Sequence, residues 1–164
     1  IYGISAFGLA ERMEVSRTEA KELITNYFTT YPRVKEYMNT SVERARELGY
    51  IVTEFGRRRY LPDITSRNAV VRGYAERNAV NAPIQGTAAD IIKIAMVHIA
   101  QRFEAEGIQS KMILQVHDEL NFSVIPSEFD HVKSIVIEEM EKAYTMSVPL
   151  LADCGEGKNW LEAH

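Results

Sequence analysis

The sequence predicts an α+β fold: a helical first half, followed by helices packed on a small antiparallel sheet. Apolar residues recur at helical spacing along most of the 164-residue chain, and they alternate with polar residues on both sides of His117-Asp118. The composition, 46% hydrophobic and 26% charged, is that of an ordinary globular protein. Because no repeat, low-complexity tract or flexible linker divides the chain, we expect one packed unit.

Two helices are expected at the start of the chain. Ser16 and Glu19 form a capping box, and apolar residues then recur at helical spacing up to Phe28. This helix stops before Pro32. The second helix ends at Gly49, because glycine readily adopts the left-handed conformation that terminates helices.

A short β-hairpin is expected from residues 50–53 and 59–61, with an arginine-rich turn between them. Charge is unevenly distributed around it. Residues 44–77 hold eight arginines and four acids, whereas residues 118–164 hold ten acids and three lysines. A basic segment beside an acidic one can place a polyanion close to carboxylates and a metal ion. Charge alone favours the simpler interpretation, two solvated faces of opposite sign.

The middle of the chain is expected to form two helices. The first runs over residues 66–82 and is broken or kinked at Pro83, because proline lacks an amide donor. Thr87 and Asp90 can cap the second, which stops at Gly107.

The last part of the chain is expected to contain the antiparallel sheet. Residues 112–116 and 120–124 alternate apolar and polar side chains and predict a hairpin. A helix follows from about residue 127, and the apolar residues 148–152 predict a third strand.

The turn of this second hairpin carries the strongest chemical signal. Tight two-residue turns favour glycine-containing pairs, yet this turn is His117-Asp118, followed directly by Glu119. Unfavourable turn residues are tolerated where their side chains matter. Carboxylates are the ligands that Mg²⁺ takes, and two-metal sites use them to activate a hydroxyl and stabilise a leaving group. A solvated acidic turn would also account for these residues.

A second group of polar residues is Arg77, Asn81 and Gln85, spaced i, i+4 and i+8 around Pro83. If the helix continues, the three side chains point the same way. A guanidinium and two amides suit the minor-groove acceptors that every base pair presents. An ordinary exposed helix face is the alternative. The neighbouring arginines 57, 58 and 59 are candidates for phosphate contacts.

Together these segments resemble the family A DNA polymerases, the bacterial DNA polymerase I family. The similar segments, in order, are IYGISAFGL (1–9), FGRRRYLPDI (55–64), AERNAVNAPIQGTAAD (75–90) and QVHDEL (115–120), with GEGKNW (155–160) near the end. The resemblance covers essentially the whole chain.

The resemblance implies a role for each candidate residue. Asp118 is expected to be one of two aspartates that hold Mg²⁺, with Glu119 supporting the site and His117 near the primer terminus. Arg77 and Gln85 are expected to contact the minor groove of the newly formed pair, with Asn81 supporting them. Tyr2 is expected to stack where the templating base and the incoming nucleotide meet.

The implied activity is template-directed DNA synthesis in replication and repair. A primer 3′-hydroxyl attacks the α-phosphate of a deoxynucleoside triphosphate and releases pyrophosphate. Residues 1–65 are expected to belong to the fingers subdomain and residues 66–164 to the palm. The family's other metal-binding aspartate lies upstream of Tyr2, so the isolated chain is expected to be inactive. The implied partners are primer-template DNA and deoxynucleoside triphosphates, bound by a monomeric enzyme.

Two other functional classes remain open on the residues alone. One is a non-catalytic duplex-binding module; the other is a metal-dependent phosphohydrolase that uses His117, Asp118 and Glu119. The single cysteine, Cys154, excludes an internal disulfide, and no apolar run approaches the ~20 residues of a membrane span. We therefore expect a cytoplasmic protein without a membrane partner.

Overall fold

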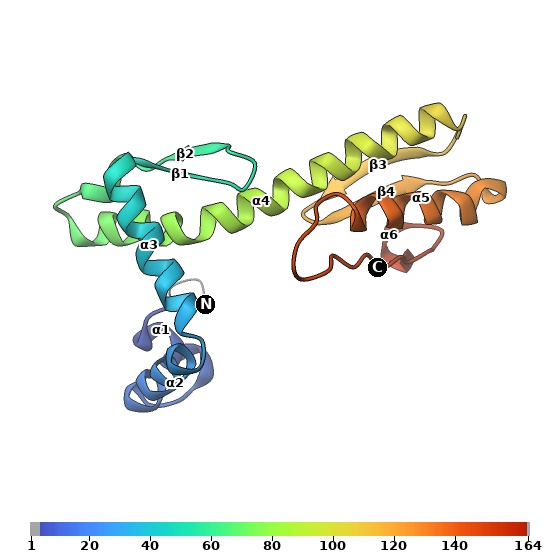
Figure 1. Cartoon of the computed structure of the whole chain (residues 1–164). Coiled ribbons are helices and arrows are strands. Elements are labelled where there is room, and N and C mark those ends of the chain that lie inside the picture. Colours follow the sequence, from blue (N-terminus) through green and yellow to red (C-terminus); the bar gives the residue numbers. More distant parts are fainter. Residues whose placement is uncertain (1–3, 164) are drawn as a thin grey trace. The chain divides into compact units, whose positions relative to one another are not determined.

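The computed structural model describes residues 4–163 and shows the expected α+β architecture, helices combined with small antiparallel sheets (Figure 1). Two compact units make up the chain, and the division lies between Thr87 and Ala88. The expectation of one packed unit is therefore wrong. The physical reason is that the long helix α4 (Ala69–Ala105) contributes its two ends to separate cores. None of the helices between residues 4 and 163 is long and apolar enough to span a membrane.

The first unit contains three helices, a hairpin and the beginning of α4. These elements are α1 (Ala6–Met13), α2 (Arg17–Thr30), α3 (Pro32–Leu48), β1 (Tyr50–Val52), β2 (Arg58–Tyr60) and the 3₁₀ turn η1 (Pro62–Thr65). Ser16 caps α2 as predicted, because its hydroxyl accepts the Glu19 N–H at 3.2 Å. Gly49 ends α3 with φ 75°. These local predictions are confirmed.

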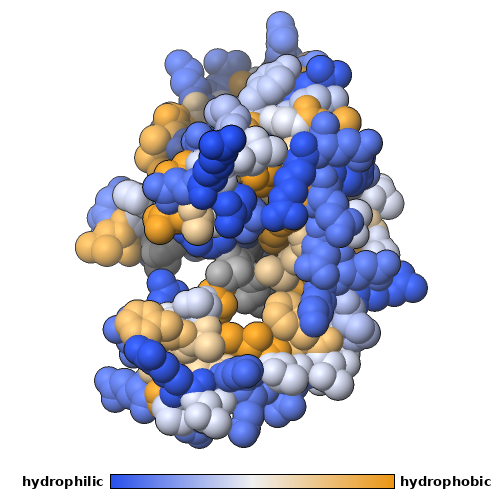
Figure 2. Space-filling view, turned by 90° about the vertical axis from the view of Figure 1, so that its left-hand side faces the viewer, coloured by the Kyte–Doolittle hydropathy of each residue, from blue (hydrophilic) through white to orange (hydrophobic). Residues whose placement is uncertain are grey.

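The core of the first unit joins α3, β1, η1 and α4. Its buried members are Ala45, Ile51, Leu61, Ile64, Ala75, Ala79 and Ala82. Elsewhere in this unit the small residues Ala10 and Ala20 are buried on α1 and α2, while Phe7 and Met13 stay 50% and 54% exposed. Hydrophobic residues accordingly gather over these two helices in the lower part of Figure 2.

Helix α4 runs unbroken through Pro83, which corrects the prediction of two helices. Proline removes one amide donor, a local loss that the rest of a long helix can absorb. The Thr87 hydroxyl donates to the Pro83 carbonyl at 2.6 Å and adds a side-chain bond at this position. The two compact units divide within α4, whereas the predicted segments 1–65 and 66–164 divide before it. Their assignment to fingers and palm stays a prediction.

The second unit packs helices on one face of a two-stranded sheet. Its elements are the end of α4, β3 (Lys111–Val116), β4 (Glu119–Ser123), the 3₁₀ turn η2 (Pro126–Glu128), α5 (Phe129–Glu141) and α6 (Trp160–Ala163). Ile99 and Ile135 are the largest fully buried side chains, one from each long helix. Leu120 and Phe122 of β4 pack against this core, which confirms the predicted hairpin and its inward face.

The predicted third strand over residues 148–152 is wrong. The structure has no strand there, and β3 and β4 pair with each other. Val148 and Leu151 are 67% and 82% exposed, and Pro149 lacks an amide donor. The apolar run therefore forms no strand here, because it does not pair with β3 or β4.

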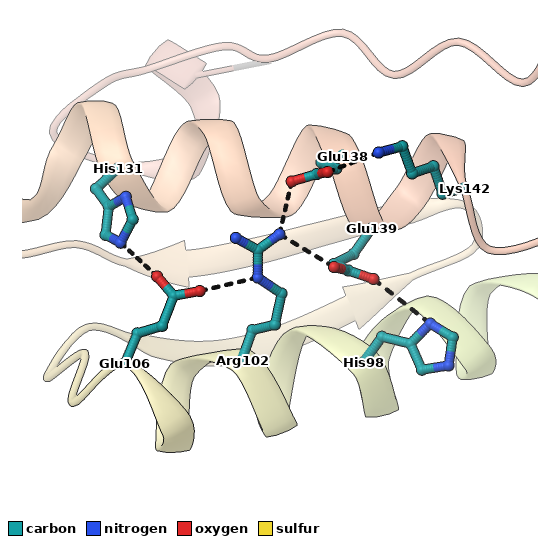
Figure 3. Close-up of polar contacts among 7 residues, drawn as sticks. All are labelled: His98, Arg102, Glu106, His131, Glu138, Glu139 and Lys142. Atoms are coloured by element: carbon teal, nitrogen blue, oxygen red, sulfur yellow. Dashed lines mark hydrogen bonds and ion pairs between the residues drawn. The ribbon is translucent and has the colours of Figure 1, made fainter.

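An ion-pair network joins α4 to α5 on the surface of the second unit (Figure 3). Arg102 donates to Glu138 at 2.6 Å, to Glu139 at 3.1 Å and to Glu106 at 3.0 Å. Two histidines extend the network, since His131 contacts Glu106 at 2.6 Å and His98 lies 3.5 Å from Glu139. Lys142 and Arg102 lower the pKa of Glu138 to about 2, because both donate hydrogen bonds to its carboxylate.

We expect Arg102→Gln to lower the free energy of unfolding more at pH 7 than near pH 2. The folded-state pKa of Glu138, about 2, lies below its ordinary value of 4.5. The stabilisation is therefore present above about pH 4.5 and is lost as the pH falls through about 2. Urea denaturation at both pH values checks this, with Lys111→Gln as a control for removing one exposed positive charge. An equal loss at both pH values would contradict the role of the network.

Candidate functional site

The turn between β3 and β4 places three polar residues at the tip of a strained hairpin. Val116 pairs with Glu119, so the turn consists of His117 and Asp118 alone. His117 has φ 52°, a left-handed conformation that is uncommon for residues other than glycine, although histidine adopts it more readily than most. The Gln115 amide donates to the His117 carbonyl at 2.6 Å and holds the turn. Strain of this kind is typical of positions where the side chains are needed.

His117 and Asp118 are exposed at this tip, and Glu119 is half-buried where β4 begins. Side chains alternate along a strand, so Glu119 and Asn121 point away from the face of β4 that packs on the helices. The Asn121 Nδ2 atom is buried and has no hydrogen-bond partner among the described residues. Asp118 and Glu119 also line a groove of about 1050 Å³, together with α5 residues and residues 151–163.

The chemistry of these donors fits Mg²⁺, which prefers carboxylate oxygens. Asp118 and Glu119 are neighbours in sequence and offer two carboxylates at the start of one strand. Across residues 4–163, no three histidine, cysteine, aspartate or glutamate side chains gather closely enough to hold a metal ion. By themselves, Asp118 and Glu119 could therefore hold only part of a magnesium site.

Arg77, Asn81 and Gln85 share one face of α4, because the helix continues through Pro83. Arg77 and Gln85 are exposed, and the Arg77 guanidinium lies 5.8 Å from the centroid of the Tyr74 ring. Asn81 is half-buried, and its Oδ1 atom is buried without a hydrogen-bond partner in the described structure. A buried acceptor without a partner costs stability and calls for an explanation, such as a water molecule or an ion that meets it. This face can donate several hydrogen bonds to an external acceptor.

The three consecutive arginines at the first hairpin are all exposed, but each also contacts the protein. Arg57 donates to the Gly86 carbonyl at 2.9 Å. The Arg58 guanidinium lies 4.7 Å from the centroid of the Tyr50 ring, and Arg59 reaches the Asn78 side chain at 3.4 Å. Sequence reasoning missed the Arg57–Gly86 bond, since no pattern relates residues that far apart.

The candidate residues thus fall into two groups, one in each compact unit. Arg57 to Arg59 and the α4 face lie in the first unit, and His117 to Glu119 lie in the second. Tyr2, predicted to stack on the templating base, lies outside the described residues.

Comparison with known proteins bears on both groups. DNA polymerase family A matches residues 1–162 of the chain. The chain is 52% identical over 163 residues to DNA polymerase I of Streptococcus pneumoniae and 51% identical over 162 residues to that of Caldicellulosiruptor bescii. In both cases the match covers 99% of this chain but 19% of the relative, so the chain spans about a fifth of their length.

A solved structure shows a similar fold. The polymerase domain of Pol1 from M. smegmatis, in complex with DNA primer-template and dNTP, superimposes with a TM-score of 0.95 at 46% sequence identity. The match covers 99% of this chain and 29% of that one. The likeness extends through both compact units.

Proposed function

The chain belongs to DNA polymerase family A, and from this premise we propose that it forms part of the active site of a DNA-directed DNA polymerase. The reaction would be attack of a primer 3′-hydroxyl on the α-phosphate of a deoxynucleoside triphosphate, with release of pyrophosphate. The longer protein would carry it out in DNA replication and repair. The main support is the likeness, at a TM-score of 0.95, to a polymerase domain solved with DNA primer-template and dNTP.

In this proposal the tip of the second hairpin holds catalytic metal. Asp118, with Glu119 beside it, would bind Mg²⁺, which when bound activates the primer hydroxyl and stabilises the negative charge on the leaving pyrophosphate. The exposed His117 would face the primer terminus. The β3–β4 ladder supports these groups, because the Val116–Glu119 pair leaves only two residues to form the turn. Positioning of charge is the main catalytic contribution that such residues make.

The face of α4 would read the shape of the newly formed base pair. Arg77 and Gln85 would donate to the minor-groove acceptors, N3 of purines and O2 of pyrimidines, which occupy nearly the same place in all Watson–Crick pairs. Asn81 would support them from its half-buried position. Arg58 and Arg59 would contact backbone phosphates from the exposed hairpin.

Metal removal tests the proposed function directly. The intact protein that contains this chain is expected to extend a primer with Mg²⁺, to lose extension completely on adding excess EDTA, and to recover it when Mg²⁺ is restored. Duplex binding, measured by fluorescence anisotropy, should persist after chelation, because the proposed DNA contacts of Arg58, Arg59 and Arg77 do not require metal. Extension that persists in EDTA would contradict the assignment of metal-dependent synthesis.

Loss of the α4 donors should change how the enzyme treats a mismatch. We expect Arg77→Ala and Gln85→Ala to slow extension from a matched primer end about tenfold, and to slow extension from a mismatched end much less. In a mispair the minor-groove acceptors are displaced, so Arg77 and Gln85 make no hydrogen bonds there, and removing these side chains costs little. Arg77 should matter more, since its charge strengthens the hydrogen bond.

The matched control for this experiment is Arg58→Ala. Because Arg58 is proposed to contact a phosphate, Arg58→Ala should weaken duplex binding uniformly and reduce the salt dependence of binding. Extension rates from matched and mismatched ends, measured at two salt concentrations, separate the two roles. If Arg77→Ala shifts only the salt-dependent affinity and leaves the matched-to-mismatched ratio unchanged, the minor-groove role is wrong.

A further inference from the structure

The turn between β1 and β2 is fastened to α4 beside Gln85. Figure 1 shows this turn reaching the helix, and two hydrogen bonds join them. The Arg57 Nη2 atom donates to the Gly86 carbonyl at 2.9 Å, and the Glu54 N–H donates to the Thr87 hydroxyl at 3.0 Å. Thr87 in turn donates to the Pro83 carbonyl at 2.6 Å. We call Thr53, Arg57, Gly86 and Thr87 the turn–helix tie.

Close packing supports the tie. A Cβ atom on Gly86 would lie 2.5 Å from Thr53 Cγ2, so only glycine lets the turn approach this closely. Thr53 is buried, 7% exposed, and its hydroxyl accepts the Arg57 N–H at 3.2 Å. The backbone of Thr53 also accepts the Gly56 N–H at 2.9 Å. The turn is therefore preshaped to present Arg57 to the helix.

The tie meets α4 next to Pro83, where the helix lacks one backbone hydrogen bond. Pro83 has no N–H to donate to the carbonyl of Ala79 in the preceding turn, which leaves the segment around it less constrained. The tie contacts the backbone at Pro83 through Thr87 and at Gly86 through Arg57. Gly86 follows Gln85 directly, so any movement of the Gly86 peptide changes the position from which the Gln85 side chain starts.

We propose that Arg57 is a positioning residue that holds Gln85 in place through the Gly86 carbonyl, and that its main role is not to bind a backbone phosphate. A guanidinium that donates to a carbonyl makes a charge-assisted bond, which is stronger than one between neutral groups. Arg58 instead lies over the Tyr50 ring, and Arg59 donates to the Asn78 side chain, so these two arginines keep the proposed phosphate role. This inference rests on the proposed function, because Gln85 acquires its role there.

The first test compares Arg57→Ala with Arg58→Ala in the intact polymerase. Arg57→Ala is expected to lower the matched-to-mismatched extension ratio about as much as Gln85→Ala, and the double variant should lose no more than about twofold beyond Gln85→Ala alone, since coupled residues are not additive. The salt dependence of duplex binding should stay unchanged for Arg57→Ala, whereas Arg58→Ala reduces its slope by about one. Arg57→Lys, which keeps one charged donor, should restore part of the ratio.

The opposite result would overturn the proposal. If Arg57→Ala reduces the salt slope by about one and leaves the extension ratio unchanged, Arg57 is a phosphate contact. Full additivity of Arg57→Ala and Gln85→Ala would also show that the two residues act separately.

A second pair of variants tests the packing without touching Arg57. Gly86→Ala should lower the extension ratio, because the new methyl group displaces Thr53. Adding Thr53→Ser removes Cγ2 and keeps the hydroxyl that accepts the Arg57 N–H, so it should restore the ratio to within about twofold. An unchanged ratio in Gly86→Ala, or no recovery in the double variant, would show that close approach of the turn does not position Gln85.

Hydrogen exchange separates failure of this inference from failure of the proposed function. In the intact protein, Arg57→Ala should raise the exchange rate of the Glu54 amide, which donates to Thr87, about tenfold. A wild-type protein that extends no primer would overturn the proposed function but leave this measurement meaningful. Unchanged exchange at Glu54 would overturn the tie whatever the polymerase activity.

Discussion

The 164-residue chain by itself is expected to extend no primer in Mg²⁺ and deoxynucleoside triphosphates. Residues 4–163 contain no cluster of three metal-ligating side chains, so Asp118 and Glu119 could supply only part of the proposed site. The family resemblance implies that the other metal-binding aspartate lies upstream of this chain, which is the basis of this prediction. Without both metal ions held in place, the attacking hydroxyl and the leaving pyrophosphate lose their main stabilisation.

The measurement is template-directed extension by the chain alone and by a longer protein that includes the upstream segment. A helical circular dichroism spectrum of the chain shows that it is folded, so that inactivity is not a result of unfolding. The longer protein should synthesise DNA. Extension by the chain alone that disappears in its Asp118→Asn variant would contradict the prediction, because the variant excludes activity from a contaminating polymerase.

In the intact polymerase, Asp118→Asn is expected to lower the rate of single-turnover incorporation about 1000-fold or more while duplex affinity stays nearly constant. Removing a carboxylate that holds metal at the developing charge costs the transition state more than the bound ground state. Asparagine has almost the same shape and is well tolerated in tight turns, so the β3–β4 hairpin should keep its structure. The lower rate of incorporation would therefore reflect a slower chemical step and not a change in structure.

Asp130→Asn is the matched control, since Asp130 is an exposed aspartate in the first turn of α5. It should incorporate nucleotides at the wild-type rate. Incorporation by Asp118→Asn within about tenfold of wild type would show that Asp118 is an ordinary turn residue. The catalytic metal would then have to be held by residues outside this hairpin.

Features that depend on neighbours in the chain could be predicted from the sequence. The Ser16 cap needs only an amide three residues away, and the Gly49 terminus needs only a residue that tolerates a positive φ. The first hairpin follows from two strand-like runs that flank a short turn, and the second from alternation on either side of its turn. The candidate residues were found in the same way, because Arg77, Asn81 and Gln85 are related by helical spacing and His117 to Glu119 are adjacent.

Features that depend on distant partners were decided only by the tertiary structure. Residues 148–152 have strand-like composition but no ladder to join, and α4 continues through Pro83 because two cores anchor its ends. The bond from Arg57 to Gly86 is likewise invisible in the sequence. Most residue types differ by no more than about 1 kcal/mol in their intrinsic preference for a helix or a strand. Such preferences favour one form of a segment without fixing it. Burial and hydrogen bonds to residues far along the chain then select among those forms. The sequence by itself therefore determined the locally capped helices and the two hairpins. Tertiary packing decided the continuity of α4, the absence of a third strand and the contact that Arg57 makes.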